Sequence, residues 1–370
     1  MFAARVTRWP STYAHGKTTL GSVERISRDV WGLVARDAQV SGLDPLRAVY
    51  LDIETTGLSG GAGTKSFLVG LGHFSDGEFE LWQGFLRGPE EEAAMLASCA
   101  ERIAASAGVV SYFGKSFDRH RLEDKMRMHG IAAPFARLPH FDLYHACRRV
   151  YGGLWSDTRL ATAEREICGV VREHDLPGSF APAAWFDFLS GRPHLLEEVF
   201  RHNRDDVLSL VSLAARLGGL GGQAHAGEHD APEALRRRAA ECRALAEACA
   251  RAKRWEESLE WAKRALELCT EAEPRREALE LVSVALKACA RTPERLAVLR
   301  ELAHAARDER AARACLEWAA DLGHGAPAEA RAALELGAGI AGECSGPGIP
   351  ALAARIDRRL HALSRAARSE

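Results

Sequence analysis

Two acidic side chains stand two residues apart in an apolar run, Leu51-Asp52-Ile53-Glu54. The run Ala48–Ile53 is predicted as a β-strand, in which alternate residues point to the same face. Asp52 and Glu54 therefore project together, and their carboxylates repel each other, most strongly where water is excluded. A bound Mg²⁺ or Mn²⁺ would relieve the repulsion, because both ions prefer oxygen ligands. The alternative is a strand edge with two solvated acids, but the polar turn Thr55-Thr56-Gly57 that follows favours a metal site.

Further acids occur at distant positions, as a site for two metal ions requires. Asp118 follows a predicted strand and Gly114 at the expected start of a helix, where it could also be only a helix cap. His202 and Asp206 are four residues apart on a predicted helix, so they share one face. Leu and Val residues near this face turn it toward the sheet. The pair could supply a metal ligand and a general base, or it could form only a buried hydrogen bond.

The composition is that of an ordinary globular protein of 370 residues, long enough for two domains. The net charge of −2 provides no general basic field, so a nucleic-acid partner would have to be held by a local groove and by metal ions. No apolar run reaches the roughly 18–20 residues of a membrane span, and the N-terminus lacks a signal core. The nine cysteines show no zinc spacing. A cytoplasmic protein with reduced thiols and no membrane association is expected.

The first part of the chain mixes strand and helix patterns, which predicts an α/β domain with a mixed sheet. The expected strands are Ala48–Ile53, Phe67–Phe74, Phe79–Phe85 and Val109–Tyr112. The expected helices are Glu90–Ser106, Phe117–His129, Leu143–Val150, Arg159–Cys168 and Leu195–Arg216. Residues 170–194, rich in Pro and aromatic residues, are expected to form a loop.

The composition changes near residue 218, where a Gly-rich segment at 218–231 is predicted to be a linker. We expect an N-terminal extension at 1–46 that packs on the α/β domain at 47–217, and an all-α domain at 232–370. In that last part the segment beginning at Arg254 returns at Arg291, an offset of 37 residues. The helix from Trp255 resembles the second helix of a tetratricopeptide unit, which predicts an array of helical hairpins. An ordinary helical bundle packed against the first domain is the alternative.

Taken in order, the acidic segments resemble those of DEDD-type exonucleases, which have a ribonuclease H-like fold. Asp52 and Glu54 lie in a D-x-E-T-T-G-L motif, Asp118 matches the second acidic motif, and Asp206 matches the fourth acid, with His202 preceding it. Residues 10 to 216 are most similar to a YprB-like subgroup of bacterial proteins, whose members often carry a helical repeat tail. The stretches that carry this similarity are His15-Gly16 with Leu20-Gly21, Gly60–Gly72, Gly114–Asp118, His140–His145, Leu176–Gly178 and His202–Leu210.

The resemblance implies phosphodiester hydrolysis with two Mg²⁺ or Mn²⁺ ions, held by Asp52, Glu54, Asp118 and Asp206. His202 would orient or deprotonate the attacking water. The implied activity is that of a 3′–5′ exonuclease on single-stranded DNA or RNA, and the helical repeats could recruit a protein partner. The residues expected to contact the substrate are Thr55, Gly57, Leu58 and Lys115, although Lys115 could equally be a solvated loop lysine.

Two positions depart from the family pattern. The subgroup usually has Asn before the Gly-Lys-Ser-Phe-Asp motif, where this chain has Phe113, so the grip on the substrate could be altered. His202 and Asp206 have the spacing of tyrosine-type enzymes with a histidine in place of the tyrosine. Two other functions therefore stay open: a nucleic-acid-binding or recruitment module with little turnover, and an endonuclease on the same scaffold.

Overall fold

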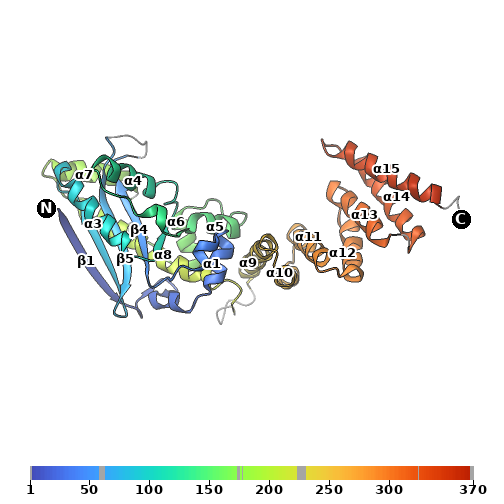
Figure 1. Cartoon of the computed structure of the whole chain (residues 1–370), viewed down its shortest axis with the longest axis horizontal. Helices are drawn as coiled ribbons and strands as arrows, with labels where there is room; N and C mark the ends of the chain where they lie inside the picture. The colour runs from blue at the N-terminus through green and yellow to red at the C-terminus, as the bar shows by residue number, and fades with distance from the viewer. Residues whose placement is uncertain are drawn as a thin grey trace. The chain divides into compact units, whose positions relative to one another are not determined.

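The structure is a computed structural model that describes residues 2–57, 63–172, 176, 178–222, 231–323 and 325–366. The chain divides into two compact units, Met1–Gln223 and Ala224–Glu370 (Figure 1). In these described residues, no helix combines the length and the apolar character needed to cross a membrane.

The first unit is built on a mixed sheet of six strands in the order β1-β6-β5-β4-β7-β8. The pairs β1–β6, β6–β5 and β5–β4 are antiparallel, whereas β4–β7 and β7–β8 are parallel. The strands are β1 (Ala3–Pro10), β4 (Ala48–Thr55), β5 (Ser66–Ser75), β6 (Glu78–Phe85), β7 (Gly108–Ser111) and β8 (His140–Asp142). A separate short pair is formed by β2 (Ala14–His15) and β3 (Thr18–Thr19).

Helices pack against the sheet (Figure 1). Their contacts account for the alternation of apolar and acidic residues along β4. Val49, Leu51 and Ile53 belong to an apolar core with residues of α3 and α4, so this face of the strand is dry. The opposite face carries Asp52, which contacts α8. The main helices are α1 (Arg28–Ala35), α2 (Ala38–Ser41), α3 (Glu92–Ala104), α4 (Asp118–Met128), α5 (Leu143–Tyr151), α6 (Leu160–Ala163), α7 (Ala181–Leu189) and α8 (Leu196–Gly218). Short 3₁₀ turns lie at η1 (Leu20–Arg25), η2 (Pro89–Glu91), η3 (Phe135–Arg137) and η5 (Gly178–Phe180), and one π-helical turn lies at η4 (Glu164–Cys168).

The predicted strands and helices are confirmed to within a few residues at each end, and the sheet is mixed as expected. Two strands of this sheet were not among the predicted ones: β1 pairs along its whole length with β6 at one edge, and β8 pairs with β7 at the other. The segment 1–46 thus contributes a strand to the same sheet that carries Asp52.

The prediction of a loop over residues 170–194 is wrong, because η5 and α7 lie within it. Pro182 occupies the first turn of α7, where a missing N–H costs nothing, so it starts the helix instead of breaking it. Trp185 then anchors α7: its ring stacks on Phe67 at 5.6 Å, and its Nε1 donates to the Leu86 carbonyl at 2.8 Å.

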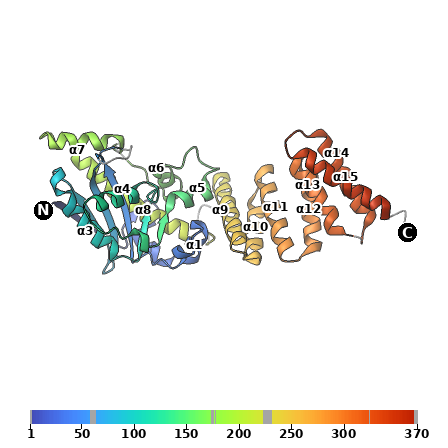
Figure 2. The same cartoon turned by 45° about the horizontal axis from the view of Figure 1, so that its top comes forward.

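The second unit consists of successive helices, each in contact with the next (Figure 2), which confirms the expected all-α region. They are α9 (Pro232–Arg251), α10 (Trp255–Leu268), α11 (Ala272–Ala288), α12 (Thr292–Ala305), α13 (Glu309–Leu322), α14 (Pro327–Glu343) and α15 (Ile349–Ala366).

The offset of 37 residues in the second unit corresponds to a structural repeat. Arg254 and Arg291 both precede a helix, and each donates from Nε to a glutamate three residues later at 2.6 Å. The residue before each arginine has a positive φ, 59° at Lys253 and 57° at Ala290. The same turn therefore closes both helical hairpins.

Candidate active site

The carboxylate of Asp52 is held by an amide on α8. Asn203 donates from Nδ2 to Asp52 Oδ2 at 2.8 Å, and its own Oδ1 accepts from Gln83 Nε2 at 2.8 Å. Because Gln83 fixes the orientation of the amide, the donor side faces Asp52. Gly70 makes room for it, since a Cβ at that position would lie 2.4 Å from Asn203 Oδ1. Asn203 was not singled out in the sequence, although it follows His202 directly.

Asn203→Ala is expected to lower the free energy of unfolding by about 1–3 kcal/mol, because Gln83 and Asp52 both lose a buried partner. Urea unfolding measures this change, and Ser190→Ala, at an exposed helix end, serves as the control. A loss below about 0.5 kcal/mol would show that the amide does not position Asp52.

Asp118 begins α4 and is 7% exposed, with Glu54 at 8% on the end of β4. Gly114 packs directly on this acid: a Cβ there would lie 3.0 Å from Asp118 Oδ2 and 2.2 Å from Ser111 Oγ. Any larger residue at 114 would push the turn away from Asp118.

The turn that presents Asp118 is braced by Asp142. The two Asp142 carboxylate oxygens accept from the backbone N–H groups of Phe113 at 2.8 Å and Lys115 at 3.0 Å. Phe113 has a φ of 62°, in the left-handed region where Asn is tolerated far better than Phe. The usual Asn of the subgroup therefore has a conformational reason at this position, whatever it does for the substrate.

The buried carboxylates act on one another. Burial, reinforced by the charges of Asp206, Glu54 and Asp118, raises the pKa of Asp52 well above its usual range. Burial likewise raises the pKa of Asp118, with Asp142, Glu54 and Asp206 adding to the effect. Asp52 of β4 and Asp118 of α4 thus share one electrostatic environment that disfavours their charged forms, and the charges of Glu54 and Asp206 contribute to it.

Arg172 already neutralises one of these acids. Its Nη2 contacts both Asp206 Oδ1 and Glu164 Oε1, and its side chain is 10% exposed. Although burial opposes it, the pKa of Arg172 is raised by Asp206 and Glu164. Neither Arg172 nor Glu164 was predicted as a site residue, because they lie in segments whose spacing carries no metal motif.

His202 lies between Arg172 and Asp206. Its Nδ1 is 3.4 Å from Arg172 Nη1, and its Nε2 is 3.7 Å from Asp206 Oδ2. A guanidinium can only donate, so Nδ1 is the acceptor and the proton of the neutral ring belongs on Nε2. In this arrangement His202 cannot accept a proton at Nε2, and a role as general base requires Arg172 to move.

The donor set fits a hard divalent cation, because it consists of carboxylate oxygens that repel one another. A preformed cation cluster is nevertheless missing: in the described part of the chain, no three His, Cys, Asp or Glu residues come close enough to hold a metal ion. One of the four acids, Asp206, instead pairs with the guanidinium of Arg172.

The predicted substrate residues differ in their surroundings. Thr55 Oγ1 donates to the Gly57 carbonyl at 3.0 Å, and a Cβ on Gly57 would meet open space. Lys115 Nζ lies 3.5 Å from Asp37 Oδ2 and is 35% exposed, so it is partly held by a surface ion pair. Leu58 lies outside the described residues.

Part of the chain is similar in sequence to known proteins. Residues 49–218 match the RNase H superfamily. The chain is also 32% identical to the uncharacterized protein YprB of Bacillus subtilis (strain 168) over 215 residues, which are 56% of this chain. The match covers 51% of YprB, so the chain spans about half the length of this relative.

Proposed function

Starting from the RNase H superfamily domain at residues 49–218, we propose that the chain is a metal-dependent nuclease that removes nucleotides from the 3′ end of single-stranded DNA or RNA. The superfamily supports a nuclease-type fold and contact with nucleic acid. The finer proposal is supported by the placement of four acids, Asp52 and Glu54 at the end of β4, Asp118 at the start of α4 and Asp206 on α8, which lie near enough for their charges to raise the pKa values of Asp52 and Asp118.

These four acids would hold two Mg²⁺ or Mn²⁺ ions, which when bound would lower the pKa of a water and neutralise the phosphate. Asn203 orients Asp52, Gly114 and Asp142 set the turn that presents Asp118, and α8 carries Asp206. His202 would align the attacking water once Arg172 no longer donates to its Nδ1. Thr55 and Gly57 lie at the end of β4, where the terminal nucleotide would contact the backbone.

A 5′-labelled single strand is the direct test. We expect a ladder that shortens from the 3′ end in Mn²⁺ or Mg²⁺ and no cleavage in EDTA, with DNA and RNA strands run in parallel to identify the preferred sugar. Cuts within a circular strand would indicate an endonuclease instead. Binding without cleavage in either metal would favour the alternative, a recruitment module, which the occupation of Asp206 by Arg172 independently supports.

A further inference from the structure

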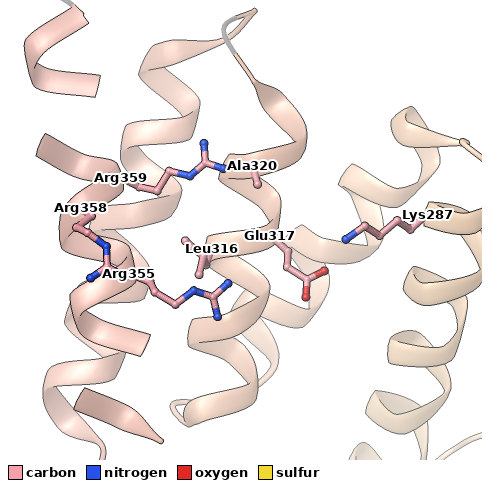
Figure 3. A pocket seen from close by; sticks show the side chains of 7 residues that line it. All are labelled: Lys287, Leu316, Glu317, Ala320, Arg355, Arg358 and Arg359. Atoms are coloured by element: carbon pink, nitrogen blue, oxygen red, sulfur yellow. The ribbon is translucent and has the colours of Figure 1, made fainter. Parts of the chain in front are cut away.

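The second unit contains a groove lined mainly by cations. Its volume is about 470 Å³, and it lies between α11, α13 and α15. Lys287 reaches it from α11, while Arg355, Arg358 and Arg359 reach it from α15 (Figure 3). Leu316 and Ala320 form a small apolar floor on α13. All four cationic residues are exposed.

The arginines of this groove differ from others in the second unit. Many other arginines of this unit pair with acids, for example Arg275 with Glu301 at 2.8 Å and Arg276 with Asp308 at 2.5 Å. Among the residues that the structure describes, none of the four groove cations forms an ion pair. Because the chain as a whole has a net charge of −2, this local excess of positive charge does not follow from its composition.

A buried arginine keeps the groove positive. Glu317 is the acid that lines it, and Arg295 pairs with both Glu317 and Asp321 while its side chain is only 2% exposed. Arg295 also donates to the Ser283 carbonyl at 3.1 Å, so it is fixed in place. Arg295 thus offsets part of the negative charge of Glu317 and Asp321, and the groove keeps an excess of cations, with Glu317 its one acid against four basic side chains.

We propose that this groove binds the phosphate backbone of a single-stranded nucleic acid. Guanidinium groups match phosphate oxygens in two parallel hydrogen bonds, and Arg355 and Arg359 lie one helical turn apart on α15, so they present successive charges. The groove is concave, unlike the flat face that would suit a lipid surface. The choice of nucleic acid over an acidic protein segment rests on the proposed function of the first unit.

The test measures binding by the full-length protein in EDTA, so that cleavage plays no part. The probe is a fluorescein-labelled single strand, and the variant carries Arg355→Gln, Arg358→Gln and Arg359→Gln. We expect affinity to fall on the order of 10–100-fold and the slope of log K against log salt to become shallower by about 2. The control, Arg238→Gln with Arg251→Gln and Lys253→Gln, removes the same number of positive charges from α9 and the turn after it, and it should bind like the unaltered protein.

Equal binding by the groove variant and the control would overturn the inference. So would displacement of the probe by polyglutamate as effectively as by unlabelled strand, since the occupant would then be an acidic protein segment. The outcome is independent of the proposed function: a protein that binds through this groove and never cleaves supports only the groove. If the variant without the three arginines still cleaves and binds normally, the result supports the proposed nuclease activity and not the groove.

Discussion

Asp52→Asn is expected to lower metal-dependent cleavage by at least about 10³-fold and, at the same time, to stabilise the metal-free protein. The first effect follows from the loss of a carboxylate that would hold both ions. The second follows because Asp52 is held among Asp206, Glu54 and Asp118, and burial makes its charge costly. A neutral amide removes that cost, so the free energy of unfolding should rise by about 1–3 kcal/mol.

The stabilisation should depend on pH with a definite sign. The pKa of Asp52 is raised in the folded state, so the folded protein binds more protons than the unfolded chain above about pH 4. The carboxylate therefore destabilises the fold increasingly as pH rises through the folded-state pKa. Below about pH 4 the free energies of unfolding of Asp52→Asn and of the unaltered protein should differ little, and at pH 8 the difference between them should be largest.

Urea unfolding of both proteins at several pH values measures this difference. Comparing the two curves is essential, because His15 and His140, whose pKa values burial lowers to about 4 and about 3, destabilise either protein at acid pH. Asp76→Asn, in the exposed turn between β5 and β6, is the control and should change neither cleavage nor stability. A variant of Asp52 that is inactive but less stable at pH 8 would mean that its carboxylate supports the fold instead of the chemistry.

The acids on β4 and α8 could be predicted because regular periodicity fixes where their side chains point. Alternation in β4 places Asp52 opposite the dry core of Leu51 and Ile53, and one helical turn places His202 beside Asp206. Asp118 could be placed only through its motif. Its geometry depends on Gly114 and on Asp142. Asp142 accepts from the backbone N–H of Lys115, and the two residues are 27 positions apart in the sequence.

The contacts that periodicity does not encode were missed. Arg172 meets Glu164 and Asp206 across 8 and 34 residues, through a segment whose prolines and aromatics predict a loop. Strand β1 was missed for a similar reason, since its pairing with β6 joins residues far apart in the sequence. Local patterns specify elements and faces, whereas the partners of a buried charge are decided by tertiary packing.

Arg172→Met should be the most destabilising single change near the site in the absence of metal. Removing one partner of a buried ion pair leaves the others uncompensated, which typically costs about 3–5 kcal/mol. Here Glu164 and Asp206 would both lose the guanidinium, and burial already raises the pKa of Glu164. Arg165→Met is a matched control in the same segment, because its pair with Glu166 is exposed and should contribute less than about 1 kcal/mol.

Mn²⁺ should reverse part of this loss. If Arg172 and a metal ion compete for Asp206, the ion should raise the melting temperature of Arg172→Met more than that of the unaltered protein. Adding Asp206→Asn to Arg172→Met should recover stability without metal and remove the response to Mn²⁺, since the carboxylate for which the two cations compete is gone. Equal Mn²⁺ responses in Arg172→Met and the unaltered protein would contradict the competition and make Arg172 a structural cation alone. A larger response in the variant would show that this arginine holds the carboxylate of α8 until a metal ion replaces it.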